Sequence, residues 1–453
     1  MVRKILFISW LIVFAIPLLL HAQKHPCMML SPESVVEIRK HLGTVPLFDL
    51  SLQQAIKEVD AAIEKGVSVP VPKDLAGGYT HEQHKQNFFL LQKAGTIFQL
   101  TGEEKYAIHM REVFMAYAEM YPKLDLHPAT RSYARGKIFW QCLNDANWLV
   151  YMSQAYDCIY DWLTAAEREK LETQLFRPFA DFLSIENPKF FNRIHNHSTW
   201  GNAGVGMMGI VMGDEELINR ALYGLNGAQT FGEQQDNDGG FINIPGQDKA
   251  GFLANIDHAF SPDGYYTEGP YYHRYAIFPF IVFARALENY YPDKQIFAYR
   301  DSLMVNSIYA LLNQTDAGGT FFPINDAQKG MSYLSRELVT AVDICYYYGG
   351  TDASLLSIAQ EQGRVLLDET GFQVAQDLAK GQATPFIRTS QELSDGANGD
   401  EGAIGILRTP QDMTLLMKYS AQGMGHGHFD KLSFSYYDGA SEVLQDYGAD
   451  HIA

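Results

Sequence analysis

Apolar residues recur at every third or fourth position along most of the chain, from about Ser31 to about Glu369. This spacing places apolar side chains on one face of an α-helix and predicts a largely helical region. Gly, Pro, Asn and Asp residues separate the periodic segments, as expected at helix ends. Paired helices at intervals of roughly a few tens of residues are typical of an all-α toroid or solenoid. The predicted helices cover residues 86–100, 105–120, 138–163, 164–183, 215–233 and 276–290.

The pattern changes after about Val374, where short strand-like runs replace the helical period. Residues 403–409 and 413–419 flank the turn Pro410-Gln411-Asp412, and residues 432–446 hold two further runs around a second turn. These segments predict the start of an antiparallel sheet. A sheet this small cannot bury a face by itself. Either it packs on the helical region, or the sequence is a fragment of a longer protein, which is the alternative that we favour.

Residues 1–22 combine a basic start, an apolar run and a small residue before Gln23. This pattern indicates a cleaved secretory signal peptide, so we expect an exported protein, periplasmic or secreted. A membrane anchor is the alternative, but the apolar run is slightly shorter than the roughly 20 residues that a span needs. No other stretch of the sequence approaches that length, so stable membrane insertion is not expected. The four cysteines share no metal-ligand spacing, and three lie in apolar helical patterns, which predicts buried thiols.

Composition and charge narrow the class of protein. The 453 residues are 47% hydrophobic and 19% charged, so the chain can bury a large core. These values exclude a disordered chain, a collagen and a small disulfide-stabilised protein. The 35 Lys and Arg against 53 Asp and Glu give a formal charge of −18, which argues against a nucleic-acid partner. An anionic substrate stays compatible with this charge, because a cleft can be locally basic while the outer surface is acidic.

His195, Asn196 and His197 come directly before a segment of small residues at 201–212 that predicts a closely packed, central helix. The free N–H groups at the start of such a helix, and the positive end of its dipole, form a natural seat for a carboxylate. Asn and His side chains placed there can donate to the same anion. The alternative is that Asn196 only caps the helix and that both histidines are ordinary core residues.

Residues 262–275 form the densest polar and aromatic segment of a chain that contains 26 Tyr. Tyrosines interleaved with acidic residues, His273 and Arg274 are costly to bury without partners. A tyrosine beside Arg or protonated His can have a lowered pKa and can then donate or accept a proton. The alternative is an aromatic cap over the following helix, with Arg274 in an ordinary ion pair.

The motif His426-Gly-His428-Phe-Asp430 carries residue types that bind metal ions, and its glycines allow close approach of the backbone. A His-x-His pair needs further ligands from elsewhere in the fold, and Asp446 on a later strand is a candidate. The alternative is a pair of exposed histidines in a turn.

A predicted helix at residues 135–151 places Gln141, Asn144 and Trp148 at helical spacing. Such a polar and aromatic face suits the hydroxyl groups of sugars, although an ordinary amphipathic helix explains the same pattern.

Taken in order, these motifs resemble the heparinase II/III and alginate-lyase superfamily of polysaccharide lyases, over nearly the whole chain after residue 22. Enzymes of this family pair an incomplete (α/α) toroid with an antiparallel β-sandwich, and their active cleft lies between the two. The resemblance therefore implies a mainly α protein, with a toroid at residues 23–374 and the first part of a sandwich at residues 375–453. The motifs that carry it are Leu100-Thr-Gly-Glu-Glu-Lys-Tyr106, Asn196-His197, Asp263-Gly with Glu268-Gly-x-x-Tyr272, His426-Gly-His428-Phe-Asp430 and Leu444-Gln-Asp446-Tyr-Gly448.

Lyases cleave a uronic-acid glycoside by β-elimination, which requires a neutralised carboxylate, a base for the C5 proton and an acid for the leaving oxygen. By resemblance, Asn196 and His197 take the carboxylate, and His197 also serves as base for one C5 epimer. Tyr272, or Tyr275 one helical turn later, is the acid, and His426 reaches into the cleft from the sandwich. The residues expected to bind substrate are Arg135, Gln141, Asn144, Trp148, His195, Trp200, Tyr271 and Arg274.

The resemblance also implies a structural zinc ion. His428 and Asp446 resemble zinc ligands that fix the sandwich loops, with a further His from later in the chain. No organic cofactor is implied.

The substrate implied by the resemblance is an acidic polysaccharide or oligosaccharide, with alginate favoured over heparin, heparan or chondroitin-type chains. The first alternative is a glycoside hydrolase on a similar toroid, with Asp263 and Glu268 as its paired carboxylates. The second is a non-catalytic polysaccharide-binding protein that has kept the fold and lost the chemistry. The sequence leaves room for a homodimer.

Overall fold

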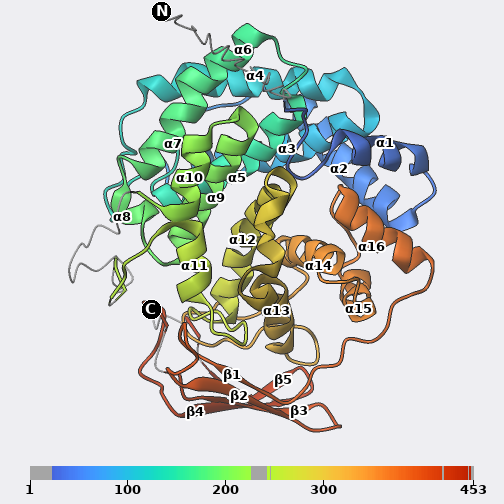
Figure 1. The fold of residues 1–453 in the computed structure, drawn as a ribbon, viewed down its shortest axis with the longest axis vertical. Helices are drawn as coiled ribbons and strands as arrows, with labels where there is room; N and C mark the ends of the chain where they lie inside the picture. The colour runs from blue at the N-terminus through green and yellow to red at the C-terminus, as the bar shows by residue number, and fades with distance from the viewer. Residues whose placement is uncertain (1–22, 226–241, 245, 421–422, 447, 450–453) are drawn as a thin grey trace, which may run out of the picture.

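The computed structural model describes residues 23–225, 242–244, 246–420, 423–446 and 448–449. The helices form a curved layer above a small sheet, and this architecture confirms the predicted mainly α, incomplete (α/α) toroid (Figure 1). The helices are α1 (Pro32–His41), α2 (Pro46–Lys65), α3 (Tyr79–Thr101), α4 (Glu104–Met120), α5 (Cys142–Ile159), α6 (Ala165–Leu171), α7 (Arg177–Ser184), α8 (Pro188–Phe191), α9 (Asn196–Met212), α10 (Glu215–Tyr223), α11 (Gly251–Ala259), α12 (Pro270–Tyr290), α13 (Tyr299–Asn313), α14 (Arg336–Tyr348), α15 (Ala353–Gln362) and α16 (Glu369–Ala379).

The predicted helices are present, with shifted ends. The segment predicted at 164–183 is divided into α6 and α7 by a π-helical stretch, Glu172–Phe176. The helix predicted at 215–233 ends at Tyr223, because Gly224 adopts a φ of 74° and breaks the helical geometry. Residues 226–233 of that prediction lie outside the described residues.

Helix α9 is the centre of the helical layer, as its small residues predicted. It packs against α5, α10 and α12, and every residue from Asn196 to Val211 is buried. At Gly206 a Cβ atom would lie 2.1 Å from the Phe283 ring, so only glycine allows α12 to approach this closely. The close packing fixes the start of α9, and with it the predicted functional residues.

The sheet is a five-stranded antiparallel meander in the order β1-β2-β3-β4-β5. Strand β1 had not been predicted, whereas the other four match the predicted runs. The helical region ends with α16, so the boundary predicted at Val374 lies inside this helix. The strands are β1 (Gln391–Ser394), β2 (Ala403–Arg408), β3 (Met413–Lys418), β4 (Ser433–Asp438) and β5 (Ser441–Leu444).

One face of the sheet packs on the helical layer. Leu393, Ile404 and Leu416 of this face form a buried cluster with Tyr265 and Phe322 of the helical region. The sheet thus buries a face by docking on the toroid, which is one of the two arrangements that the sequence allowed. This docking brings the loop after β3 against the start of α9.

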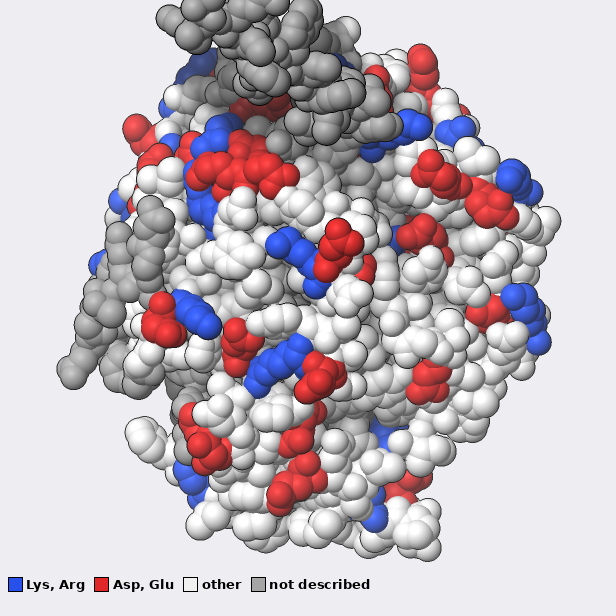
Figure 2. Space-filling view, viewed as in Figure 1, with Lys and Arg blue, Asp and Glu red and all other residues white. Residues whose placement is uncertain are grey.

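Acidic and basic side chains are interspersed over the face shown in Figure 2, on the helical layer as well as near the sheet. Cys142, Cys158 and Cys345 are buried free thiols, as predicted. Within the described residues, no helix combines the length and apolar character that crossing a bilayer requires. The predicted signal peptide at residues 1–22 lies outside the described residues.

Candidate active site

The candidate active site begins at the N-terminus of α9, where His195, Asn196 and His197 are all buried. The His195 side chain caps the helix, because its Nδ1 accepts the His197 N–H at 3.3 Å. The His195 N–H donates to Asn255 Oδ1 at 3.0 Å, which fixes the chain just before the helix. The interpretation of Asn196 as the cap is therefore wrong, since Asn196 is the first helical residue and its side chain donates to Glu268.

The carboxyl group of Glu268 lies at the start of α9. Its fully buried carboxylate accepts the Asn196 N–H at 2.8 Å, the Asn196 side-chain amide and the Tyr266 hydroxyl at 2.7 Å. Burial, and then the charge of Glu268, raise the pKa of Tyr266 well above its ordinary value, so this hydroxyl stays a donor. The sequence predicted that the N-terminus of α9 binds a substrate carboxylate. In the structure the Glu268 side chain occupies this position and orients the amide of Asn196.

His197 lies beside Tyr133, a residue that the sequence reasoning missed. The Tyr133 hydroxyl is 3.1 Å from His197 Nδ1, and the two rings are nearly parallel. Burial, and then the charge of Arg193, lower the pKa of His197 well below its ordinary value. His197 is therefore a neutral imidazole at pH 7, able to accept a proton.

His426 arrives from the loop after β3 and completes the cluster. Its Nε2 lies 3.5 Å from Glu268 Oε2, and His195 Nε2 lies 3.6 Å from the same oxygen. On its other side the His426 ring stacks on Tyr272, with centroids 3.7 Å apart. The structure therefore brings together four of the five predicted catalytic residues, namely Asn196, His197, Tyr272 and His426.

Tyr275, the fifth predicted catalytic residue, is held apart from this cluster. Its hydroxyl donates to Asn147 Oδ1 at 3.0 Å, and its ring packs on Trp200. Burial raises the pKa of Tyr275 above its ordinary value, which makes it a poorer proton donor. The geometry therefore favours Tyr272 over Tyr275 as the acid.

Arg274 and Tyr271 lie next to each other, with the guanidinium carbon 5.1 Å from the centre of the Tyr271 ring. Arg274 also forms an ion pair of 3.1 Å with Glu337, as the alternative interpretation of this segment predicted. Its Nε is buried and makes no hydrogen bond to any described residue. Arg274 and Glu337 line a cavity of about 930 Å³ inside the helical layer, so Arg274 has a donor left for a ligand.

Two tryptophans predicted to bind substrate are core residues. Trp148 is fully buried between the rings of Tyr117 and Phe179, with centroids 4.9 Å from each. Trp200 is 1% exposed and packs on Phe278. For Trp148, the helical spacing that suggested a polar face describes a buried face equally well. Both rings pack among core residues, and the role of either tryptophan towards a substrate stays a prediction.

The remaining predicted binding residues are partly exposed. Arg135 donates to the backbone carbonyls of His127 and Ala129, so it braces its own loop. Gln141 and Asn144 bind each other at 3.1 Å at the start of α5. Their role towards a substrate stays a prediction.

Asp263 and Glu268, the two carboxylates of the hydrolase alternative, do not lie in one site. Asp263 is exposed and binds the backbone and side chain of Ser394, whereas Glu268 is fully buried under α9. Two carboxylates that flank a glycosidic bond must both face the substrate. Asp263 and Glu268 do not meet this requirement.

His428, Asp430 and Asp446 place one ligand atom each within 4.8 Å of one another. His428 and Asp446 were predicted metal ligands, and Asp430 is an addition from the same motif. Nitrogen and carboxylate oxygen atoms form a donor set that suits zinc. Asp430 also pairs with Lys418 at 2.8 Å, which holds the loop against β3.

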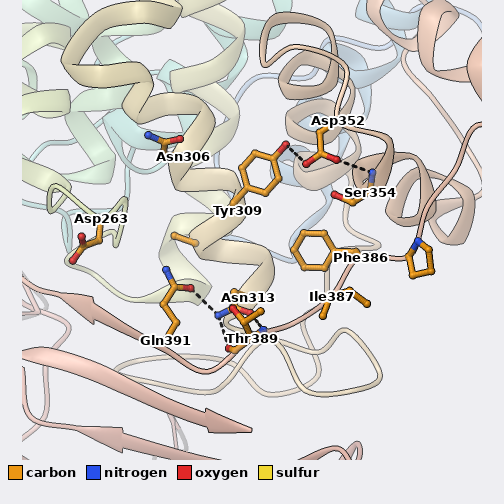
Figure 3. A pocket seen from close by; sticks show the side chains of 12 residues that line it. Asp263, Asn306, Tyr309, Asn313, Asp352, Ser354, Phe386, Ile387, Thr389 and Gln391 are labelled. Carbon is orange, nitrogen blue, oxygen red and sulfur yellow. Dashed lines mark hydrogen bonds between the residues drawn. The ribbon is translucent and has the colours of Figure 1, made fainter. Parts of the chain in front are cut away.

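A separate cavity of about 500 Å³ lies between α13, the start of α15 and the segment leading to β1 (Figure 3). Tyr309 donates to Asp352 at 3.0 Å, and Asn313 donates to Gln391 at 2.8 Å. These polar groups are thus satisfied by one another. The cavity lies where the helical layer meets the segment that leads to the sheet.

Two family models match the chain. The alginate lyase model matches residues 91–314, and the heparinase II/III-like C-terminal model matches residues 391–453. An exo-oligoalginate lyase from Saccharophagus degradans is 44% identical over 428 residues, which are 94% of this chain and 55% of that protein. An alginate lyase from Stenotrophomonas maltophilia is 45% identical over 389 residues, which are 85% of this chain and 50% of that protein. The chain spans about half the length of these curated relatives.

Solved structures share the fold at low sequence identity. An alginate lyase from Bacteroides ovatus superposes with a TM-score of 0.52 at 10% identity, over 78% of this chain and 99% of that one. A heparan sulfate lyase mutant from Pedobacter heparinus gives 0.51 at 15% identity, over 87% and 55% of the two chains.

Proposed function

Because this chain belongs to the superfamily of alginate lyases and heparinase II/III-like polysaccharide lyases, we propose that the full-length protein cleaves a uronic-acid-containing polysaccharide or oligosaccharide by β-elimination. The observation that carries the proposal is the meeting of Tyr272 and His426 beside Asn196 and His197, which joins a proton donor, a proton acceptor and amide donors. The names of both relatives favour alginate as the substrate.

The reaction removes the C5 proton of the uronate and breaks the bond between C4 and the glycosidic oxygen. The electron pair of the C5–H bond forms the new C4–C5 double bond, and the leaving oxygen takes a proton. The products are a shortened chain and a 4,5-unsaturated uronate end. Amide and imidazole donors around the substrate carboxylate stabilise the negative charge that develops next to C5.

Asn196 and His197 provide the groups for this carboxylate, and with one C5 epimer His197 instead accepts the C5 proton. Glu268 orients the Asn196 amide, and Tyr133 engages Nδ1 of His197, which leaves Nε2 as the nitrogen available to the substrate. The neutral state of His197 at pH 7 follows from its lowered pKa and allows it to accept the proton.

Tyr272 supplies the proton to the leaving oxygen. Its ring stacks on His426, so the position of its hydroxyl depends on how the sheet docks on the helical layer. A positioned phenol is a competent general acid when neighbouring groups hold its orientation. In substrates with both reacting groups on one face, the same tyrosine also serves as base.

A structural zinc ion belongs to the proposal as well. His428, Asp430 and Asp446 fit it because their ligand atoms converge, and the resemblance adds a further His. When bound, the ion cross-links the loops that carry His426. We also propose that the protein is exported, which the signal-peptide pattern of residues 1–22 supports. A homodimer is compatible with the proposal.

The test is an ultraviolet absorbance screen of the full-length protein on alginate, its homopolymeric blocks, heparin, heparan sulfate, chondroitin sulfate and hyaluronan. A lyase produces an absorbing C4–C5 double bond without consuming water, and we expect it first on alginate. New reducing ends without absorbance would indicate a hydrolase, and binding without either signal would indicate a non-catalytic protein. Absorbance on a glycosaminoglycan alone would move the substrate to the heparin and chondroitin class.

A further inference from the structure

Asp326 contacts both histidines of the His426-Gly-His428 motif. Its Oδ2 lies 3.0 Å from His426 Nδ1, and its Oδ1 lies 2.8 Å from His428 Nε2. Asp326 belongs to the loop between α13 and α14 of the helical layer, whereas the histidines follow β3 of the sheet. One carboxylate of the toroid therefore holds a catalytic candidate and a metal-ligand candidate at the same time.

The loop that carries Asp326 is fixed on three sides. The Asp326 N–H donates to the His426 carbonyl at 3.1 Å, and the Ala449 N–H donates to the Ala327 carbonyl at 2.8 Å. The Asn325 side chain donates to the Glu268 carbonyl at 3.1 Å. These bonds set the position of the carboxylate before any ligand is bound, so Asp326 can orient its two partners.

For His426, the contact decides how the ring is turned. Its Nδ1 edge faces Asp326, its opposite nitrogen lies 3.5 Å from Glu268, and its face stacks on Tyr272. Without the Asp326 carboxylate, nothing hydrogen-bonds either ring nitrogen among the described residues. Without this hydrogen bond the His426 ring is free to rotate, and rotation would change its stacking on Tyr272.

For His428, the contact decides which nitrogen is available to a metal. Because Asp326 binds Nε2, the ring nitrogen that remains for the cluster with Asp430 and Asp446 is Nδ1. A carboxylate on the second nitrogen fixes the tautomer and raises the basicity of a ligating histidine.

We propose that Asp326 is a positioning residue that couples the metal-ligand cluster to the catalytic cluster, by orienting His428 for the metal and His426 for Tyr272. This inference rests on the proposed lyase function. It goes beyond it by assigning a residue outside the predicted catalytic and metal-ligand residues, and by linking two sites that otherwise share only a loop.

The test compares Asp326→Asn with a matched control in the full-length protein. Asn is nearly the same size but offers one acceptor oxygen instead of two. Lys329→Ala is the control, because Lys329 comes from the same loop and pairs with Glu442 of β5 at 2.8 Å, without touching either histidine. Asp326→Glu, which keeps both acceptors, is the rescue variant. Each protein is measured at a temperature at which circular dichroism shows it folded, for zinc affinity by competition with a chelator and for kcat and KM on alginate.

We expect Asp326→Asn to lose about tenfold or more in zinc affinity and in kcat, with KM nearly unchanged, since partners of metal ligands have effects of this size. Lys329→Ala should match the wild type, and Asp326→Glu should recover part of both losses. Unchanged zinc affinity or unchanged kcat in Asp326→Asn would overturn the coupling, as would equal losses in Lys329→Ala. A wild type that takes up no zinc would overturn it too. If the wild type binds zinc but cleaves no polyuronate, the proposed function fails, and the zinc affinity of Asp326→Asn still decides this inference.

Discussion

The ring of Tyr272 lies 3.7 Å from the ring of His426, centroid to centroid, and the two planes differ by 13°. Tyr272 is in the first turn of α12, whereas His426 follows β3, so the contact crosses the joint between the toroid and the sheet. The position of Tyr272, the proposed acid, therefore depends on both parts of the fold. Changes in the docking of the sheet should therefore affect turnover.

Tyr272→Phe should lower kcat by about a hundredfold or more, because the proton for the leaving oxygen is lost. The melting temperature should stay near the wild-type value, since phenylalanine keeps the stacking on His426. Steady-state kinetics and thermal melts check both expectations.

Tyr275→Phe is the matched control for this change. It removes the hydrogen bond to Asn147, so we expect a loss of about 1 kcal/mol in stability and a smaller effect on kcat. If Tyr275→Phe alone abolishes turnover, Tyr275 is the acid and the geometric assignment of Tyr272 is wrong.

Glu268→Gln should destabilise the protein by about 1–3 kcal/mol, because an amide in place of the buried carboxylate leaves a donor opposite Asn196 or Tyr266. Activity should fall with it, since the start of α9 loses its fixed geometry. Denaturant unfolding of Glu268→Gln and of the surface variant Asp263→Asn checks the prediction, and the latter should stay within about 0.5 kcal/mol of the wild type. Full stability with complete loss of activity would instead make Glu268 a catalytic carboxylate, as a hydrolase requires.

The sequence predicted the elements better than it predicted their contacts. The small residues of α9 and the position of Asn196 and His197 at its start are local features, so both could be inferred. Glu268 was named only in the Glu268-Gly-x-x-Tyr272 motif and as a carboxylate of the hydrolase alternative. Its pairing with Asn196 joins segments that are distant in the chain, and no local pattern specifies it. The spacing of Trp148 fits a sugar-binding face and a core equally well, and only packing between helices distinguishes them.

The contacts of Tyr133 and Asp326 could not be predicted for a related reason. Tyr133 lies in a loop before α5, and Asp326 lies in a loop between α13 and α14. Loop residues follow no period, so their partners depend on how the completed toroid meets the sheet. The same docking decides that Tyr272, and not Tyr275, meets His426.

Removal of zinc should lower the melting temperature of the full-length protein by several degrees, because binding to the folded state alone stabilises it. Added zinc should restore it, and Asp446→Asn should lower the response to zinc. The rate per folded molecule should fall less than the stability does at low temperature, because a structural ion would support the loops that carry His426 without taking part in the reaction. An immediate and reversible loss of rate at constant melting temperature would contradict this and indicate a catalytic metal.

Acid should destabilise the protein in part through His273 of α12. This ring is fully buried near Phe260 and Tyr266, and neither nitrogen has a hydrogen-bond partner among the described residues. Burial lowers the pKa of His273 to about 3, against about 6.5 in an unfolded chain. Between these values the unfolded state binds a proton that the folded state does not, so the unfolding free energy falls as the pH drops below about 6.5, by up to about 1.4 kcal/mol per pH unit for this group.

His273→Leu should therefore flatten the dependence of stability on pH, while leaving the protein at least as stable as the wild type at pH 7.5, because it removes two unsatisfied polar atoms. Denaturant unfolding at several values between pH 7.5 and pH 5 measures the slope. His41→Gln is the control, since it also removes one imidazole but from a side chain that is 40% exposed. An identical slope in His273→Leu and the wild type would mean that His273 is hydrogen-bonded or hydrated in the folded protein, and that other buried groups set its response to acid.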